Sequence, residues 1–236
     1  MGLLNADAET YAQFLSDPVK VAQVDVYQAA NYGTSVTPFY TTLALWVGAI
    51  ILVALIKCQV DYKDEEYMNA RPHQRYFGRL ILFLIMGQIQ AVIVVLGDLY
   101  LLKIKCLHPG LLFLAASIAS FVFTLLIYTL TLSFGDVGKA LAVVMVVIQI
   151  AGSSGTYPIE LLPDFFKTVY LYFPFPYAIN AMREAISGCY HNDYGIYLLQ
   201  LLVFALGALL VGLLIRIPFI GLNHFFEKRM KDTDMM

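Results

Sequence analysis

The chain has 236 residues, of which 60% are hydrophobic and 14% are charged, and its formal net charge at pH 7 is −2. A soluble domain rarely carries so much apolar residue against so little charge, so this composition excludes an ordinary soluble fold. It predicts an all-α polytopic membrane protein whose main partner is the lipid bilayer. The slightly acidic charge balance gives no support for nucleic-acid binding.

The first 37 residues are polar and mixed in charge, and they lack the apolar core of a signal peptide. They pass abruptly into an apolar run at Pro38. A polar segment of this kind suggests the end of a longer polar region. We therefore expect residues 1–37 to lie outside the membrane-spanning part of the chain.

Five apolar runs follow, and they set the expected number of membrane helices. A helix needs about 20 residues to cross a bilayer. Four of the five runs have this length. The remaining one, which is the fourth in chain order, is too short unless the GSSGTYP that follows it is included. Irregular backbone at membrane depth is tolerated only where protein or a watery cavity covers its polar groups. The sequence therefore predicts five crossings, of which the fourth has an irregular outer end, at about 39–57, 80–102, 110–134, 137–152 and 194–219.

Lysine and arginine are distributed unevenly between the two sides that five crossings create. Because basic residues concentrate in cytoplasmic loops, the richer side is expected to face the cytoplasm. This places the N-terminus outside and the C-terminus inside, with a transmembrane domain at 38–221 and a cytoplasmic tail at 222–236. The residues on the richer side are Lys57, Lys63, Arg71, Arg75, Arg79, Lys139, Arg216, Lys228, Arg229 and Lys231, against Lys20, Lys103, Lys105, Lys167 and Arg183 on the other.

A few polar residues interrupt the apolar runs. Amide and small residues in membrane helices commonly hydrogen-bond between helices, and this packing role is the first interpretation. The second interpretation is a polar path through the membrane domain. Asp98 lies near the outer end of its run, where water is expected to reach it, and it is a candidate proton or substrate site. The residues of such a path are Gln88, Gln90, Asp98 and Gln149.

The predicted cytoplasmic loop from Val60 to Arg79 mixes both signs of charge. Its DEEYMNA stretch has reasonable helix propensity, and Pro72 would end such a helix. Two interpretations are open: a short helix anchored at the inner membrane surface, or a docking element for a cytoplasmic partner. The residues expected in the docking element are Glu65, Glu66, Arg71, Pro72, Arg75 and Arg79.

Motifs for catalysis or for holding a cofactor do not occur in the sequence. It contains no GxxxxGK[ST] P-loop, no HExxH and no GxSxG pattern. Cys58, Cys106 and Cys189 are scattered and lack ligand spacing, so we expect free thiols and no metal site. The sequence thus predicts neither an enzyme nor a cofactor, but a protein that moves, anchors or passes something.

Three stretches resemble a known family: NYGTSVTPFYTTLALWVGAIIL at 31–52, RPHQRYFGR at 71–79 and GSSGTYPIELLPDFFKTVYLYFPFPYAINAMREAISG at 152–188. Together they resemble the C-terminal membrane half of the YhgE/Pip proteins. These are bacterial membrane proteins, first named for a role in phage infection, that are similar to ABC-2 permeases. The resemblance covers nearly the whole chain. Its most specific positions are Gly152, Pro158, Leu162, Pro163, Pro176 and Arg183.

The resemblance implies six crossings, namely one N-terminal helix, a long extracellular domain and then five more helices. This chain has the five, so we expect a C-terminal fragment in which residues 1–37 are the end of the extracellular domain. The resemblance also implies a bacterial cell membrane, a homodimer or a partner permease half, and a separate cytoplasmic ATPase under the Val60–Arg79 loop.

The resemblance further implies that the connection between the last two helices dips into the outer leaflet as two short helices. The prolines fit such an outer hairpin, and eight aromatics would hold it at the interface: Tyr157, Phe165, Phe166, Tyr170, Tyr172, Phe173, Phe175 and Tyr177. Arg183 and Glu184 are expected as an interfacial ion pair or as snorkelling side chains. The expected hairpin residues are Gly152, Gly155, Pro158, Pro163, Pro174, Pro176, Arg183 and Glu184.

Two functions are left open by the sequence. The first is a membrane permease of an ABC-2-type export or transport system. The second is a non-transporting membrane scaffold or receptor, for example in phage infection or in a secretion machinery.

Overall fold

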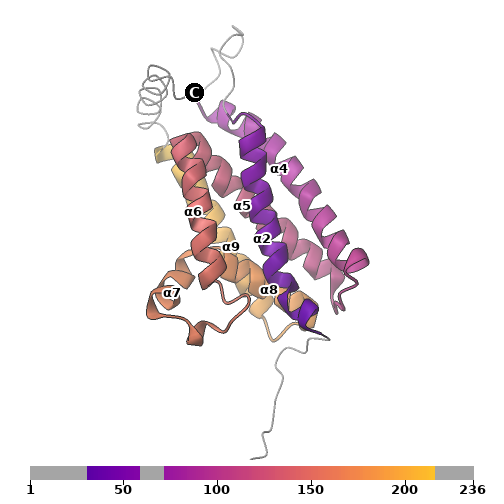
Figure 1. Cartoon of the computed structure of the whole chain (residues 1–236). Coiled ribbons are helices and arrows are strands. Elements are labelled where there is room, and N and C mark those ends of the chain that lie inside the picture. Colours follow the sequence, from indigo (N-terminus) through magenta and orange to yellow (C-terminus); the bar gives the residue numbers. More distant parts are fainter. Residues whose placement is uncertain (1–30, 59–71, 216–236) are drawn as a thin grey trace, which may run out of the picture.

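A computed structural model describes residues 31–58 and 72–215 (Figure 1). Every regular element in these two ranges is a helix. Several sequence predictions lie outside the described residues: residues 1–30, the docking-loop residues Glu65, Glu66 and Arg71, and the chain after Ile215, which includes the predicted tail.

Five long helices pack side by side and alternate in direction. Helices α2, α5 and α9 run one way through the bundle, and α4 and α6 run the other way (Figure 1). Helix α4 continues into the π-helical turn η1 at Gly97–Leu101, and α9 continues into η4 at Val211–Ile215. The long helices are α2 (Tyr32–Leu55), α4 (Pro72–Leu96), α5 (Pro109–Phe134), α6 (Asp136–Gly152) and α9 (Asp193–Leu210).

Four of the described helices are long and apolar enough to cross a membrane, namely Tyr32–Leu55, His73–Leu101, Pro109–Phe134 and Asp193–Leu213. Helix α6 has 17 residues, which at a rise of 1.5 Å per residue gives about 25 Å. The hydrocarbon core is about 30 Å thick. The prediction of an all-helical membrane protein is therefore confirmed with four spanning helices, and α6 is the short member that the sequence indicated.

Helix α2 begins seven residues before the predicted start at Phe39. Asn31 caps it, because its side-chain Oδ1 accepts a hydrogen bond from the backbone N–H of Thr34 at 2.8 Å. Pro38 then lies inside the helix, where it removes a backbone donor. Close to it, Thr37 Oγ1 donates a further hydrogen bond to the Gly33 carbonyl, at 2.8 Å. The predicted boundary at residue 37 thus falls within α2.

The turn between α5 and α6 depends on two glycines. Gly135 has a φ of 61°, in the left-handed region that favours glycine. Three residues later, a Cβ on Gly138 would overlap the carbonyl oxygen of Leu130 on the preceding helix. This close approach brings α6 back along α5 with a single residue between the two helices.

Trp46 of α2 stands at the centre of the core. Its ring centroid lies 5.1 Å from that of Phe123 on α5 and 5.3 Å from that of Phe175, and both contacts are edge-on. Its indole Nε1 donates to the Ala142 carbonyl of α6 at 3.2 Å. Edge-to-face aromatic pairs contribute about 0.5–1.5 kcal/mol each beyond their buried area. One side chain therefore joins α2, α5, α6 and the segment that carries Phe175.

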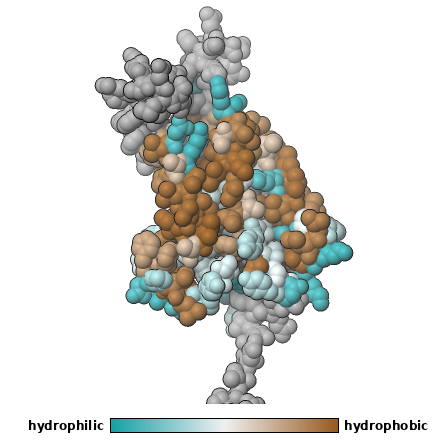
Figure 2. Space-filling view, in the orientation of Figure 1, coloured by the Kyte–Doolittle hydropathy of each residue, from teal (hydrophilic) through white to brown (hydrophobic). Residues whose placement is uncertain are grey.

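Helix α5 is the central element and contacts α2, α4, α6, α9 and the shorter helix α8 (Phe175–Ser187). A second aromatic group holds it to α4: Tyr128 donates its hydroxyl to the Tyr76 carbonyl at 3.0 Å, and the Tyr76 hydroxyl lies 2.7 Å from Thr129 Oγ1. On the face in Figure 2, hydrophobic residues cover the middle of the bundle, and hydrophilic residues gather at its two ends. This is the surface pattern of a bundle that spans a bilayer.

Candidate functional site

The segment between α6 and α9 is divided by its prolines into short helical pieces. Pro158 precedes the single turn η2 (Ile159–Leu161), and Pro163 precedes α7 (Asp164–Val169). A further 3₁₀ turn, η3 (Tyr170–Tyr172), completes the segment. Pro fits the start of a helix because its missing N–H is not needed there. The predicted role of Pro158 and Pro163 agrees with these boundaries.

The next two prolines, which the sequence placed in the outer hairpin, stand at the start of a longer helix. Helix α8 (Phe175–Ser187) starts directly after Pro174, with Pro176 in its first turn. It packs against α2, α5 and α9. Its buried face includes Phe175, which is fully buried. The expectation that Phe175 lies at the membrane interface is therefore wrong, because this ring fills the core beside Trp46.

Other aromatics of this segment do face outward. Tyr157, Phe165 and Tyr172 are 66%, 60% and 74% exposed, and Leu161 and Leu171 are exposed beside them. Lys167 and Asp164 form an ion pair at 3.0 Å on the same short helix. An apolar surface with a few charges suits the boundary between membrane and water. We call residues 153–173, which contain η2, α7 and η3, the outer segment.

Two glycines let the outer segment lie against the bundle. A Cβ on Gly152 would come within 2.7 Å of the Phe166 ring, and a Cβ on Gly155 would overlap the ring of Phe39 on α2. Glycine is therefore required at both positions for this packing. The sequence predicted these residues in the hairpin but not their partners.

Arg183 and Glu184 take different positions on α8. Arg183 donates to Asn180 Oδ1 at 3.1 Å and to the Ser154 carbonyl at 3.3 Å, so it ties the start of the outer segment to α8. Glu184 is fully buried, and its carboxylate accepts a hydrogen bond from the Tyr190 backbone N–H at 2.6 Å. Burial of Glu184 corrects the interfacial or snorkelling position that the sequence suggested.

Gln149 lies near the end of α6 and is 2% exposed. Its Oε1 accepts a hydrogen bond from the Phe175 backbone N–H at 3.3 Å, which satisfies a donor in the first turn of α8. Gln149 also lines a small cavity of about 10 Å³ together with Ser153, Tyr170 and Phe173. It therefore joins α6, α8 and the outer segment.

The remaining polar residues of the predicted path each hold a pair of helices together. Gln88 of α4 bonds with Ser117 of α5 through both its amide atoms. Gln90 of α4 packs over Gly48 of α2. Asp98 in η1 accepts a hydrogen bond from Thr41 of α2 at 2.6 Å. These contacts, together with that of Gln149 to α8, are the interhelical packing of the first interpretation.

Asp98 differs in one respect from its prediction. Water was expected to reach it, but Asp98 is 7% exposed. The reason is that η1 turns its carboxylate toward Thr41, a residue that sequence reasoning did not single out. A threonine on an otherwise apolar helix was the available signal, because such a hydroxyl commonly bonds across to a neighbouring helix.

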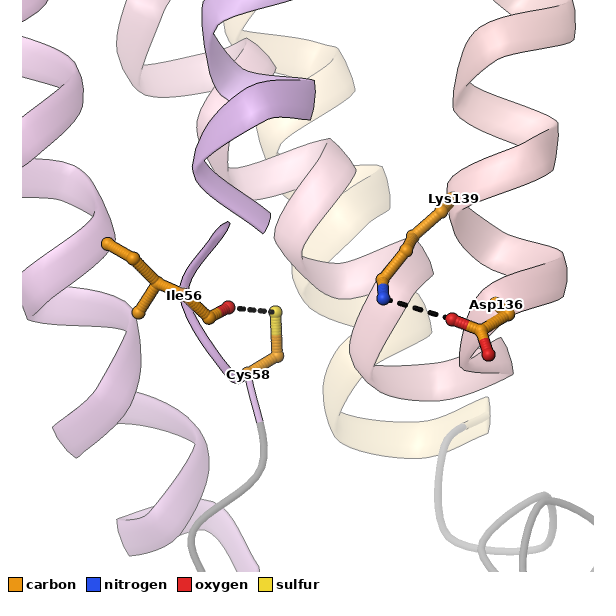
Figure 3. Close-up of polar contacts among 4 residues, drawn as sticks. All are labelled: Ile56, Cys58, Asp136 and Lys139. Atoms are coloured by element: carbon orange, nitrogen blue, oxygen red, sulfur yellow. Dashed lines mark hydrogen bonds and ion pairs between the residues drawn. The ribbon is translucent and has the colours of Figure 1, made fainter. Parts of the chain in front are cut away.

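The end of the bundle opposite the outer segment carries a group of cations. Lys139 pairs with Asp136 at 2.9 Å at the start of α6, and Arg79 Nε donates to the Lys57 carbonyl at 3.0 Å. Cys58 lies at the same end (Figure 3). Burial raises the pKa of its thiol to about 11, although Lys139 and Arg79 counteract the shift in part. Of the predicted docking residues, Arg75 and Arg79 are thus on α4, which begins at Pro72.

Comparison with known proteins identifies the class. Residues 3–214 match the family described as ABC-2 family transporter protein. The chain is 29% identical over 216 residues to the Uncharacterized protein YhgE of Bacillus subtilis (strain 168), which confirms the resemblance to YhgE. The similarity covers 92% of this chain but 27% of that relative, so the chain spans about a quarter of YhgE. No solved structure matches the chain. The family match extends over nearly all of an all-helical membrane bundle, and the chain therefore belongs to the ABC-2 family of transporter proteins.

Proposed function

We propose that the chain is the membrane-spanning permease part of an ABC-2-type export or transport system in a bacterial cell membrane. A substrate would pass between two copies, or between one copy and a partner permease half. A separate ATPase would drive the movement from the cytoplasmic side. In this proposal the chain moves its substrate and does not transform it.

The observation that carries the proposal is the family match over residues 3–214. The sequence has no P-loop motif, so ATP hydrolysis would come from outside these 236 residues. The match covers 27% of YhgE, which supports the proposal that the chain corresponds to one part, the C-terminal membrane part, of a longer YhgE-like protein.

A fifth crossing by α6 is part of the proposal. Helix α6 runs along the bundle between its two ends and antiparallel to α5 (Figure 1), and it contacts α2 and α5. Its apolar side chains Val143, Val144 and Val147 are exposed and would face lipid. The outer segment would then complete the outer leaflet where α6 ends. Five alternating crossings would place the N-terminus outside and the C-terminus inside.

We further propose that the ATPase docks at the end of the bundle that holds Lys139 and Arg79. Basic residues concentrate on the cytoplasmic side of membrane proteins, and an acidic surface of a partner would be attracted there. Arg79 is half-buried and already bonded to the Lys57 carbonyl, so it is held in one position at this surface.

The test is co-purification of the protein, with its natural flanking regions, from its own membrane. We expect a P-loop ATPase to co-purify, and Arg79→Glu to reduce its recovery several-fold because the charge at the docking surface is reversed. Arg79→Lys should keep most of the recovery. Lys105→Glu makes the same charge reversal at an exposed position at the other end of the bundle, and recovery should not change.

If no P-loop ATPase is recovered and no ATP turnover responds to the protein, the permease proposal fails. The non-transporting scaffold or receptor would then be the better description. Equal loss of recovery in Arg79→Glu and Lys105→Glu would reject the docking surface alone.

A further inference from the structure

Helix α6 has 17 residues and is about 25 Å long, shorter than the hydrocarbon core of about 30 Å. In the proposed crossing, the polar groups at its end therefore lie at membrane depth. The helix stops at Gly152, and Ser154 follows with a φ of 57°, so the chain turns sharply. Polar groups at membrane depth must be covered by protein or by water in a cavity. The residues around this turn, or water held among them, must therefore provide hydrogen-bond partners for these polar groups.

A small cavity lies at this turn, between the end of α6 and the outer segment. Its volume is about 10 Å³, and its lining includes Gln149, Ser153, Tyr170, Phe173 and Pro176. One water molecule needs about 10–15 Å³ of such space and two or more polar partners. The cavity is thus at the lower limit of size for a single water and too small for any larger ligand.

Two residues that line the cavity each have a side-chain atom that needs a hydrogen-bond partner. Gln149 and Ser153 are each 2% exposed. Within the described part of the chain, neither Gln149 Nε2 nor Ser153 Oγ has a partner. A buried polar atom without a partner destabilises the folded state, because it has lost its hydrogen bonds to water. Two such atoms four residues apart at the end of α6 call for a shared hydrogen-bond partner.

The orientation of the Gln149 amide follows from its other contact. Its Oε1 accepts the hydrogen bond of the Phe175 N–H, so the Nε2 donor is left for the cavity. Ser153 Oγ can both donate and accept. Water has both a donor and an acceptor, so its hydrogen-bonding groups match Gln149 Nε2 and Ser153 Oγ together. A cation would be repelled by the amide donor.

We propose that this cavity is a binding site for one water molecule, held between Gln149 Nε2 and Ser153 Oγ. The water joins the end of α6 to the outer segment and satisfies the polar groups where α6 stops within the membrane. It fastens the outer segment to α6 through hydrogen bonds. The cavity and its polar residues belong to the folded chain whatever it transports, and only their depth in the membrane rests on the proposed crossing by α6.

The direct test is an experimental structure of the protein in lipid nanodiscs, at a resolution that shows ordered water. We expect one water within about 2.7–3.2 Å of both Gln149 Nε2 and Ser153 Oγ. A well-defined map without density in the cavity would overturn the proposal.

A pair of variants gives an independent test by thermal unfolding. Ser153→Ala removes a hydroxyl that bonds to the water, so Tm should fall by about 2–4 °C. Thr131→Val is the matched control, since Thr131 Oγ1 is also buried without a partner in the described chain but does not line this cavity. Removing it should leave Tm unchanged or raise it. If Ser153→Ala also leaves Tm unchanged or raises it, Ser153 has no water partner and the proposal is wrong.

Discussion

Single residues at the helix contacts decide how closely the helices approach. Trp46 bonds through its indole to α6 and packs its ring against α5 and α8. Gln88 and Ser117 exchange hydrogen bonds between α4 and α5. Interhelical packing was the first of two interpretations of the amide residues, beside a polar path, and their contacts agree with packing. The sequence did not identify Trp46 as a central residue, since a single tryptophan in a run of apolar residues gives no sign of which helix face is buried.

The thiol of Cys58 gives a prediction at this scale. Burial raises its pKa from 9.0 to about 11, and the thiolate is the reactive form. Iodoacetamide at about pH 8 should therefore label Cys58 only after unfolding, whereas the exposed Cys189 is labelled in the folded protein. Mass spectrometry of the labelled peptides measures both. Equal labelling rates for the two thiols would show that Cys58 is not buried.

The same shift has a consequence for stability. The folded state favours the neutral thiol of Cys58, whereas in the unfolded chain this thiol has a pKa of 9.0. The contribution of Cys58 to stability is therefore complete below about pH 9 and is lost as the pH rises through about 11. Cys58→Ala should remove this part of the pH dependence.

At the scale of elements, the sequence located the helices well but not the role of each. The four long apolar runs and the short one correspond to α2, α4, α5, α9 and α6. The prolines at 158 and 163 were correctly interpreted as boundaries of short pieces. Helix α8 was not predicted as a core helix, because the sequence assigned its prolines and aromatic residues to the outer hairpin, although Ile179, Met182 and Ile186 follow the spacing of one helix face.

The hairpin of α5 and α6 provides a prediction at the scale of elements. Gly138→Ala places a Cβ against the Leu130 carbonyl oxygen, which is backbone and cannot move aside. We expect a loss of about 1–3 kcal/mol in stability, typical of overpacking. Gly78→Ala on α4 is the control, because nothing lies within 4 Å of its Cβ, and it should be neutral or slightly stabilising.

Thermal unfolding in detergent measures both glycine variants. A Gly138→Ala variant as stable as Gly78→Ala would mean that α6 does not approach α5 as closely as described.

For the whole molecule, the alternation of helix directions assigns each connection to one end of the bundle. Backbone hydrogen bonds join the α4–α5 connection to the end of α8, from Leu107 to Ile186 and from His108 to Ala185, at 3.0 and 3.1 Å. These segments are at the end that holds the outer segment (Figure 1). Cys58, Arg79 and Lys139 gather at the opposite end. This separation is what the proposed orientation requires.

Accessibility of introduced cysteines tests the orientation in intact cells. In a background without native cysteines, a membrane-impermeant maleimide should label Tyr157→Cys from outside. It should label Lys139→Cys only after the cells are opened. Both positions are sufficiently exposed for reaction. The opposite pattern would invert the topology, and labelling of both from outside would show that α6 does not cross the membrane.

The sequence by itself determined the class of the molecule, the positions of its membrane helices and its family resemblance. These properties depend on composition and on local runs of apolar residues. Both can be read from one segment of the chain without knowing which other segments pack against it. Only the tertiary structure decided that Phe175 and Glu184 are buried, that Asp98 faces Thr41, and that Gln149 and Ser153 share a cavity. Those facts depend on contacts between residues far apart in the chain, and the periodicity of one segment carries no information about the side chains that another segment places against it.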